Sequence, residues 1–87
     1  MNRLEIYTKN WCPFCHAAKR LLKEKRIAFT EYDVTDDSAL ERKMQTRSGR
    51  TSVPQIFIDD KHIGGYDDLA EQWAAGVLPI AEASRFL

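Results

Sequence analysis

The fold is decided by one stretch near the N-terminus, Leu4-Glu5-Ile6-Tyr7-Thr8-Lys9-Asn10-Trp11-Cys12-Pro13-Phe14-Cys15. Leu4–Thr8 alternates and carries residue types that favour β-structure, so it predicts a strand. Pro13 suits the first turn of a helix, where its missing N–H is not needed and its φ is already suitable. We expect that helix to run to about Lys25. Its apolar stripe consists of Ala18, Leu21 and Leu22.

The rest of the chain alternates between strand and helix patterns in the same way. Two further strands are predicted at 27–34 and 55–58, and a short fourth strand begins at His62. Helices are predicted from 36–38 to Gly49 and from 67–68 to Gly76, with another turn or two of helix in 80–87. The order β-α-β-α-β-β-α makes the first two strands parallel, through a right-handed crossover, and the last two an antiparallel hairpin. We therefore predict an α/β fold, a mixed four-stranded sheet with helices on both faces.

Length and charge restrict the class of protein. The chain of 87 residues is long enough for one domain, 1–87, and too short for two. Its 13 basic and 13 acidic residues balance, so it lacks the positive charge of a nucleic-acid-binding protein. Residues 1–7 include an acid and no apolar core, unlike a signal peptide, and no apolar run reaches membrane-spanning length. We expect a cytoplasmic protein that binds neither nucleic acid nor membranes.

Cys12 and Cys15 form a C-x-x-C motif at the start of the first predicted helix. A bridge between them would close too short a loop to stabilise the fold much, which favours a chemical role. The free N–H groups and dipole of the helix start favour the thiolate form of Cys12, and Lys9 adds a positive charge nearby. We predict that Cys12 is exposed and attacks disulfides. Cys15 is predicted to be less accessible and to attack the resulting mixed disulfide.

The same cysteines also allow two metal interpretations. A structural zinc site needs four ligands, and only His16 and His62 could join the cysteines; His16 directly follows Cys15, which would strain the site. Residues 12–16 also match the C-x-x-C-H string of c-type haem attachment. Haem attachment requires export and a second axial ligand, and the sequence indicates neither. We therefore predict no metal site.

Two other motifs have both an ordinary and a functional interpretation. Pro54 ends the run Thr-Ser-Val-Pro and suits the start of a strand, but a cis bond after Val53 would instead turn backbone polar groups toward an extended ligand. Residues 64–68, Gly-Gly-Tyr-Asp-Asp, form either an ordinary turn and helix cap or a binding site. In that site, helix amides would bind a carboxylate and an aspartate would bind an amine. The motifs alone leave both choices open.

In this order and spacing, the motifs resemble the glutaredoxin family from Leu4 to about Val77. The matching segments are residues 7–9, 12–15, 48–58 and 64–69. The resemblance implies the thioredoxin fold with strand order 2-1-3-4. It also implies a glutathione-dependent thiol–disulfide oxidoreductase without a tightly bound cofactor. Such an enzyme reduces protein–glutathione mixed disulfides by a monothiol mechanism and protein disulfides by a dithiol mechanism.

The resemblance further implies a glutathione site. In it, Cys12 forms the mixed disulfide, Lys9 meets the glycine carboxylate, and the backbone of Val53 pairs with the cysteinyl residue. Two aspartates hold the γ-glutamyl end, and a second basic residue, Arg42 or Arg47, helps Lys9. The full set of predicted glutathione-binding residues is Lys9, Phe14, Ser52, Val53, Pro54, Gly65, Asp67 and Asp68.

Two departures from the family pattern and two alternative functions accompany this prediction. Phe14 stands where dithiol members usually carry tyrosine, and this change is expected to shift the reduction potential. Ser52 replaces a more usual threonine.

One alternative function is that of a redoxin reduced by thioredoxin reductase; the other is that of a dimer that carries a [2Fe–2S] cluster through Cys12 and two glutathiones. We expect a monomer whose partners are oxidised or glutathionylated proteins, with ribonucleotide reductase a family-level candidate.

Overall fold

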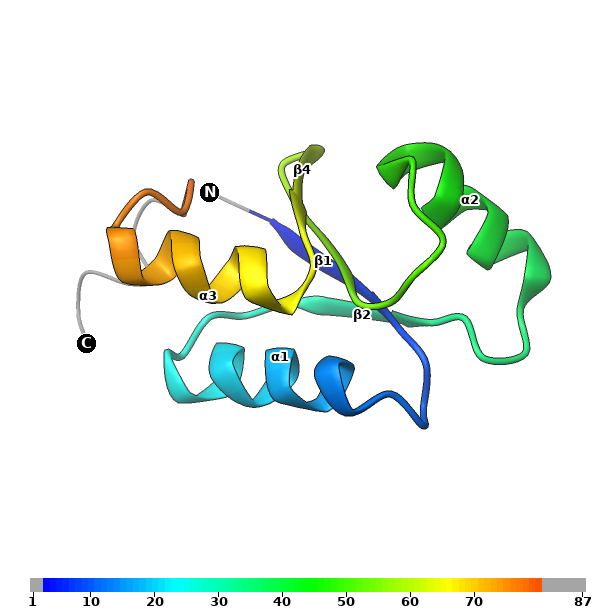
Figure 1. The fold of residues 1–87 in the computed structure, drawn as a ribbon, viewed down its shortest axis with the longest axis horizontal. Helices are drawn as coiled ribbons and strands as arrows, with labels where there is room; N and C mark the ends of the chain where they lie inside the picture. The colour runs from blue at the N-terminus through cyan, green and yellow to red at the C-terminus, as the bar shows by residue number, and fades with distance from the viewer. Residues whose placement is uncertain (1–2, 81–87) are drawn as a thin grey trace.

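The computed structural model describes residues 3–80, which form a single four-stranded sheet with helices packed on it (Figure 1). The element order is the predicted β-α-β-α-β-β-α. The elements are β1 (Leu4–Thr8), α1 (Pro13–Glu24), β2 (Thr30–Asp33), α2 (Ser38–Ser48), β3 (Gln55–Ile58), β4 (Lys61–Gly64) and α3 (Tyr66–Ala75). Within the described part of the chain, no helix is long and apolar enough to span a membrane.

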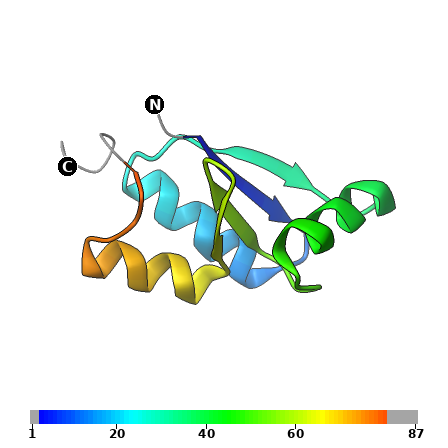
Figure 2. The ribbon, with the colours of Figure 1, turned by 90° about the horizontal axis from the view of Figure 1, so that it is seen from above.

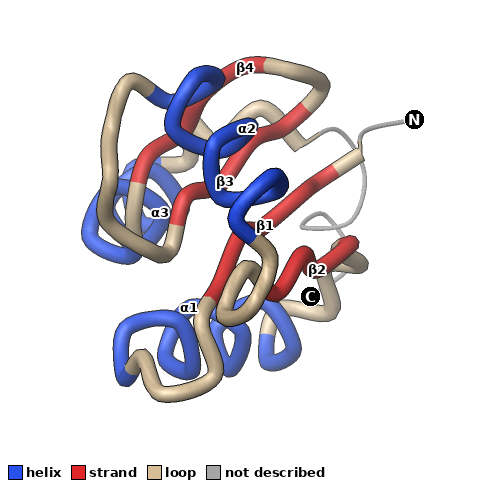
Figure 3. Tube along the Cα trace, turned by 90° about the vertical axis from the view of Figure 1, so that its right-hand side faces the viewer, coloured by secondary structure: helices blue, strands red, loops and turns tan. Residues whose placement is uncertain are grey.

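The strands lie in the order β2-β1-β3-β4, as predicted, and can be followed across the sheet in Figure 3. β1 pairs with β2 in parallel, as a crossover through α1 requires. β1 pairs with β3 in antiparallel orientation, and β3 pairs with β4 in a hairpin. The predicted fold class is therefore confirmed.

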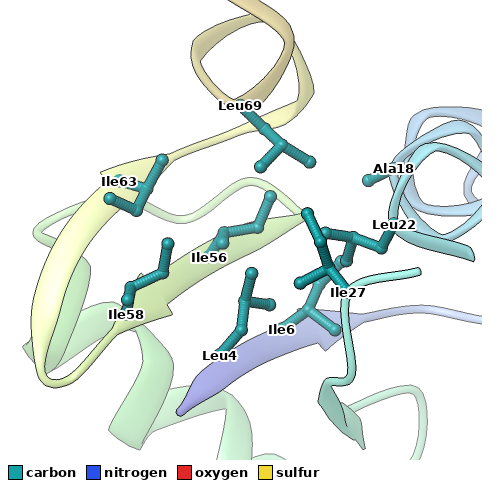
Figure 4. Close-up of a cluster of buried hydrophobic side chains, with 9 residues drawn as sticks. All are labelled: Leu4, Ile6, Ala18, Leu22, Ile27, Ile56, Ile58, Ile63 and Leu69. Carbon is teal, nitrogen blue, oxygen red and sulfur yellow. The ribbon is translucent and has the colours of Figure 1, made fainter. Parts of the chain in front are cut away.

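Two apolar clusters hold the layers together. The larger cluster fills the space between the sheet and the helices α1 and α3, which lie side by side in Figure 2. Figure 4 shows its members: Leu4, Ile6, Ala18, Leu22, Ile27, Ile56, Ile58, Ile63 and Leu69. The smaller cluster joins α2 to the opposite face through Tyr7, Val34, Met44 and Phe57. Strand side chains alternate between the two clusters, so both faces of the sheet are covered.

The second strand is shorter than the predicted range 27–34. α1 ends in a turn in which Arg26 has a positive φ of 58° and the Ile27 N–H donates to the carbonyl of Leu22 at 2.9 Å. Ile27 is thus buried in the core before the chain becomes extended. The first helix also ends at Glu24, close to the predicted position. The helix predicted in 80–87 falls almost wholly outside the described residues.

The topology brings three segments together at one end of the sheet. The start of α1 follows the carboxyl end of β1, the loop at 49–54 leads into β3, and the start of α3 follows β4 (Figure 1). Because β3 runs antiparallel to β1, its beginning lies beside the end of β1, where Tyr7 pairs with Gln55. This end of the sheet carries the candidate site.

Candidate active site

Cys12 is the N-cap of α1 and links this helix to the loop before β3. Its Sγ accepts a hydrogen bond from the backbone N–H of Cys15 at 3.1 Å. Its thiol also donates to the carbonyl of Val53, with the two atoms 3.6 Å apart. The sulfur of Cys12 thus lies at the amide end of α1, where the partial positive charge of a helix is concentrated.

The predicted exposure of Cys12 is wrong, although the ranking of the two cysteines is confirmed. Cys12 is only 4% exposed, and Cys15 is fully buried at 0%. The N-cap position turns the Cys12 side chain inward, between the first turn of α1 and the backbone of Val53, and this contact covers it. Burial, reinforced by the neighbouring Cys12, raises the pKa of Cys15 to about 12. In the reduced protein, Cys15 is therefore a protonated thiol at neutral pH.

This difference between the cysteines predicts selective alkylation. Iodoacetamide at neutral pH should modify Cys12 and leave Cys15 unmodified, because the reactive species is the thiolate and Cys15 is both buried and protonated. Mass spectrometry of peptides from the native protein measures the modified fraction at each position. The Cys12→Ser variant should remain unlabelled under the same conditions. Labelling of Cys15 at a rate comparable to that of Cys12 would contradict the assignment.

A pocket of about 300 Å³ opens between α1, the 49–54 loop and the start of α3. Its lining residues are Phe14, Arg50, Ser52, Val53, Pro54, Gln55, Gly65, Tyr66, Asp67 and Asp68. Every predicted glutathione-binding residue except Lys9 is among them. The peptide bond between Val53 and Pro54 is cis, as the functional interpretation of that motif predicted. The structure thus brings residues from three distant segments into one concave surface.

The start of α3 brings both positive and negative groups to one side of this pocket. Gly65 is the N-cap, and its N–H donates to Oδ2 of Asp68 at 3.0 Å. The same oxygen lies 3.4 Å from Nη1 of Arg50 on the 49–54 loop. The carboxylate of Asp67 is exposed at the pocket rim. The free amides of the first helical turn can therefore receive a carboxylate beside an aspartate that can receive an amine.

Gln55 supports the loop that carries Val53, a role that sequence reasoning missed. It is 1% exposed, and its Nε2 donates to the carbonyl of Ser52 at 3.0 Å and to its hydroxyl at 3.3 Å. Its Oε1 accepts a bond from Nε2 of His62 at 2.7 Å. Burial and the nearby charge of Arg50 lower the pKa of His62, so this ring is neutral at pH 7. The only sequence signal was a polar residue opening an otherwise apolar strand.

Lys9 is held beside the pocket and does not line it. Its Nζ forms a salt bridge of 2.9 Å with Oε2 of Glu41 on α2 and lies 5.6 Å from the ring centroid of Trp11. Arg47, one of the two expected helpers, instead packs its guanidinium 4.0 Å from the ring centroid of Phe57. Its donors bind Tyr7, Glu5 and Asp60. Arg42, the other, is exposed on α2.

The histidines have protein partners of their own. Nε2 of His16 donates to the carbonyl of Asn10 at 3.1 Å, which ties the first turn of α1 to the loop before it. His62 bonds to Gln55 in the hairpin, as described above. Across residues 3–80, no group of three or more His, Cys, Asp and Glu side chains is placed to hold a metal ion.

Comparisons with known proteins are consistent with this geometry. The family model for glutaredoxin matches residues 4–63. Glutaredoxin 3 of Escherichia coli K12 is 53% identical over 78 residues, covering 90% of this chain and 94% of that protein. A buckwheat glutaredoxin–glutathione complex superposes with a TM-score of 0.80 at 28% identity, covering 88% of this chain and 73% of that one.

A second solved structure, this one of a bacterial protein, also has a similar fold. The glutaredoxin of Brucella melitensis has a TM-score of 0.74 at 44% identity, covering 85% of this chain and 80% of that one. Family model, sequence identity and fold therefore agree with a C-x-x-C motif at a helix start beside a pocket. The chain belongs to the glutaredoxin family of thiol–disulfide oxidoreductases.

Proposed function

We propose that this chain reduces disulfides with glutathione as the electron donor, using Cys12 as the nucleophile. The observation that carries the proposal is the position of the Cys12 sulfur, between the amide of Cys15 and the carbonyl of Val53. Val53 itself lines the pocket and its carbonyl contacts Cys12, so a thiol compound bound there would have its sulfur close to Cys12. The chain would act in the cytoplasm, as one domain and without a tightly bound cofactor, on glutathionylated or oxidised proteins.

In the monothiol reaction, the Cys12 thiolate attacks the glutathione sulfur of a protein–glutathione mixed disulfide. A new S–S bond joins Cys12 to glutathione, the old S–S bond breaks, and the protein sulfur leaves as a thiolate that takes up a proton. The thiolate of a second glutathione then attacks the glutathione sulfur on Cys12. Oxidised glutathione leaves, and Cys12 returns as a thiolate at the helix start, where negative charge is stabilised.

The pocket and its edge would offer a partner for each part of glutathione. The backbone of Val53 would pair with the cysteinyl residue like an added strand, beside Pro54. The amides at the start of α3 would bind the γ-glutamyl carboxylate, and the exposed carboxylate of Asp67 would bind its amine. The ring of Phe14, 6.3 Å from that of Tyr66 between centroids, would cover the apolar part of the ligand. Lys9 would meet the glycine carboxylate at the pocket edge.

In the dithiol reaction, a protein disulfide replaces the glutathione mixed disulfide. Cys12 attacks one sulfur of that disulfide and releases the other as a thiol. Cys15, one helical turn on and within hydrogen-bond distance of Cys12 through its backbone, then attacks the Cys12 sulfur and frees the protein. The Cys15 thiol gives up its proton in this attack, and the departing protein thiolate takes up a proton. The oxidised pair is reduced by two glutathiones.

The division of roles predicts the behaviour of Cys15→Ser. This variant should retain glutathione-dependent reduction of a small glutathione mixed disulfide, within about threefold of wild type. It should lose reduction of protein disulfides, because no second thiol can release the bound protein. Both activities are measured by coupling to glutathione reductase and NADPH. Loss of the first activity, or retention of the second, would contradict the role of Cys15 as the resolving residue.

The same coupled assay tests the proposed function itself. Wild-type protein should reduce a glutathione mixed disulfide in a reaction that depends on glutathione. Turnover with thioredoxin reductase in place of glutathione would instead indicate the alternative redoxin function. Visible absorption of the protein purified without oxygen would indicate the alternative of a cluster-carrying dimer. Ribonucleotide reductase is the first candidate protein substrate that we would test in this assay.

A further inference from the structure

The ammonium group of Lys9 is already occupied in the free protein. Its Nζ lies 2.9 Å from Oε2 of Glu41, and the two side chains are only 22% and 27% exposed. The ring of Trp11 contacts the same ammonium from another side, at 5.6 Å from its centroid. Lys9 therefore lies between an anion and an aromatic face, and an arriving ligand has to compete with Glu41 for its ammonium group.

Glu41 is fixed close to Lys9 by the helix that carries it. It lies in the first turn of α2, and its backbone N–H donates to the carbonyl of Asp37 at 2.9 Å. The helix dipole stabilises a carboxylate in the first turn, and this interaction favours the observed position of the Glu41 side chain. The three basic side chains of α2 do not compensate, because Arg42 and Lys43 are exposed and Arg47 is bound to Tyr7 and Glu5.

A ligand carboxylate that approaches Lys9 meets Glu41 as a competitor. It must either take the ammonium from Glu41 or share it, and sharing places two like charges within a few ångströms of each other. A ligand with a neutral group at the same end meets no such repulsion. We propose that Glu41 is a specificity-determining residue that weakens binding of the anionic glycine end and favours thiol ligands that are neutral there. This proposal rests on the proposed function, since it assumes that glutathione binds in the pocket with its glycine end toward Lys9.

The test compares two unreactive ligands with one difference between them. S-methylglutathione carries the glycine carboxylate, and its glycine amide carries a neutral group of the same shape. Dissociation constants of both are measured by calorimetry or NMR titration for wild type and for Glu41→Gln. The variant should bind S-methylglutathione about two- to fivefold more tightly, the range expected for a partly exposed ion pair. Its affinity for the amide should be unchanged.

Three controls separate this effect from a general change in charge. Glu24→Gln makes the same change on the exposed C-terminal turn of α1, and should alter neither dissociation constant. Adding Lys9→Gln to Glu41→Gln should remove the gain, because the glycine carboxylate then has no ammonium to bind. High salt should reduce the difference between Glu41→Gln and wild type.

The measured dissociation constants either support the proposal or overturn it. A gain for S-methylglutathione alone supports the proposal. No change, an equal gain for both ligands, or weaker binding of S-methylglutathione by Glu41→Gln overturns it, while glutathione-dependent turnover by the wild type still supports the proposed function. If wild type binds neither ligand and shows no such turnover, the proposed function fails and this proposal fails with it.

Discussion

Replacing Cys12 by serine should lower glutathione-dependent turnover to below about a thousandth of the wild-type rate. Disulfide exchange requires a sulfur nucleophile, and the mixed disulfide with glutathione cannot form on a serine oxygen. Cys15 cannot take over, because it is fully buried, and burial, the largest cause of its raised pKa, remains when Cys12 is replaced. The loss should therefore extend to both small mixed disulfides and protein disulfides.

The matched variant for this measurement is Cys15→Ser, which makes the same chemical change one helical turn away. Circular dichroism and urea unfolding should show that both variants fold, since serine is also a good N-cap residue at position 12. The coupled assay then separates the two cysteines. Measurable turnover by Cys12→Ser, or an equal loss in both variants, would mean that the nucleophile has been assigned wrongly.

Replacing Gly64 by alanine should destabilise the fold by about 2–4 kcal/mol and also raise KM for glutathione. Gly64 has a φ of +123°, a conformation that alanine rarely adopts. A Cβ at this position would also overlap the carboxylate of Asp68 and lie 2.9 Å from its Cβ. Asp68 would have to move, and the cap on the Gly65 N–H, at 3.0 Å, would be lost at the start of α3. Urea unfolding and the coupled assay measure the two effects.

Gly49→Ala provides the control for backbone strain alone. Gly49 also has a positive φ, of 70°, but a Cβ there would meet no residue beyond its chain neighbours within 4 Å. Its replacement should cost about 1 kcal/mol from the left-handed conformation and leave KM unchanged. If both alanine variants lost the same stability and kept the same KM, the clash with Asp68 would have no functional consequence.

Most of the fold could be predicted because its signals are local. The proline after Cys12, the alternation in Leu4–Thr8 and the glycine that ends α2 each act within a few residues, and all three elements formed as expected. The early part of the second strand could not be predicted in this way. Ile27 and Phe29 are β-formers, but the left-handed turn at Arg26 places Ile27 in the core before the strand begins.

The candidate site could be predicted only in part. The residues around the pocket belong to recognisable motifs, so most of the lining was foreseen. The contacts that these residues make with other segments could not be predicted, because side-chain contacts across the fold leave no pattern in the sequence. Pairing of Lys9 with Glu41, enclosure of Cys12 by Val53, and the bond of Arg50 to Asp68 each join segments that are distant in the chain.

The hydrogen bonds of Gln55 have a thermodynamic consequence for binding. Its amide holds Ser52, and its carbonyl is held by His62, so the loop beside Cys12 is anchored to the hairpin by a buried side chain. The site is thus preorganised, and little conformational entropy remains to be lost when a ligand arrives. A ligand as small as a tripeptide can form few contacts with its receptor. The more rigid the receptor is before binding, the larger the share of the energy of those contacts that appears as affinity.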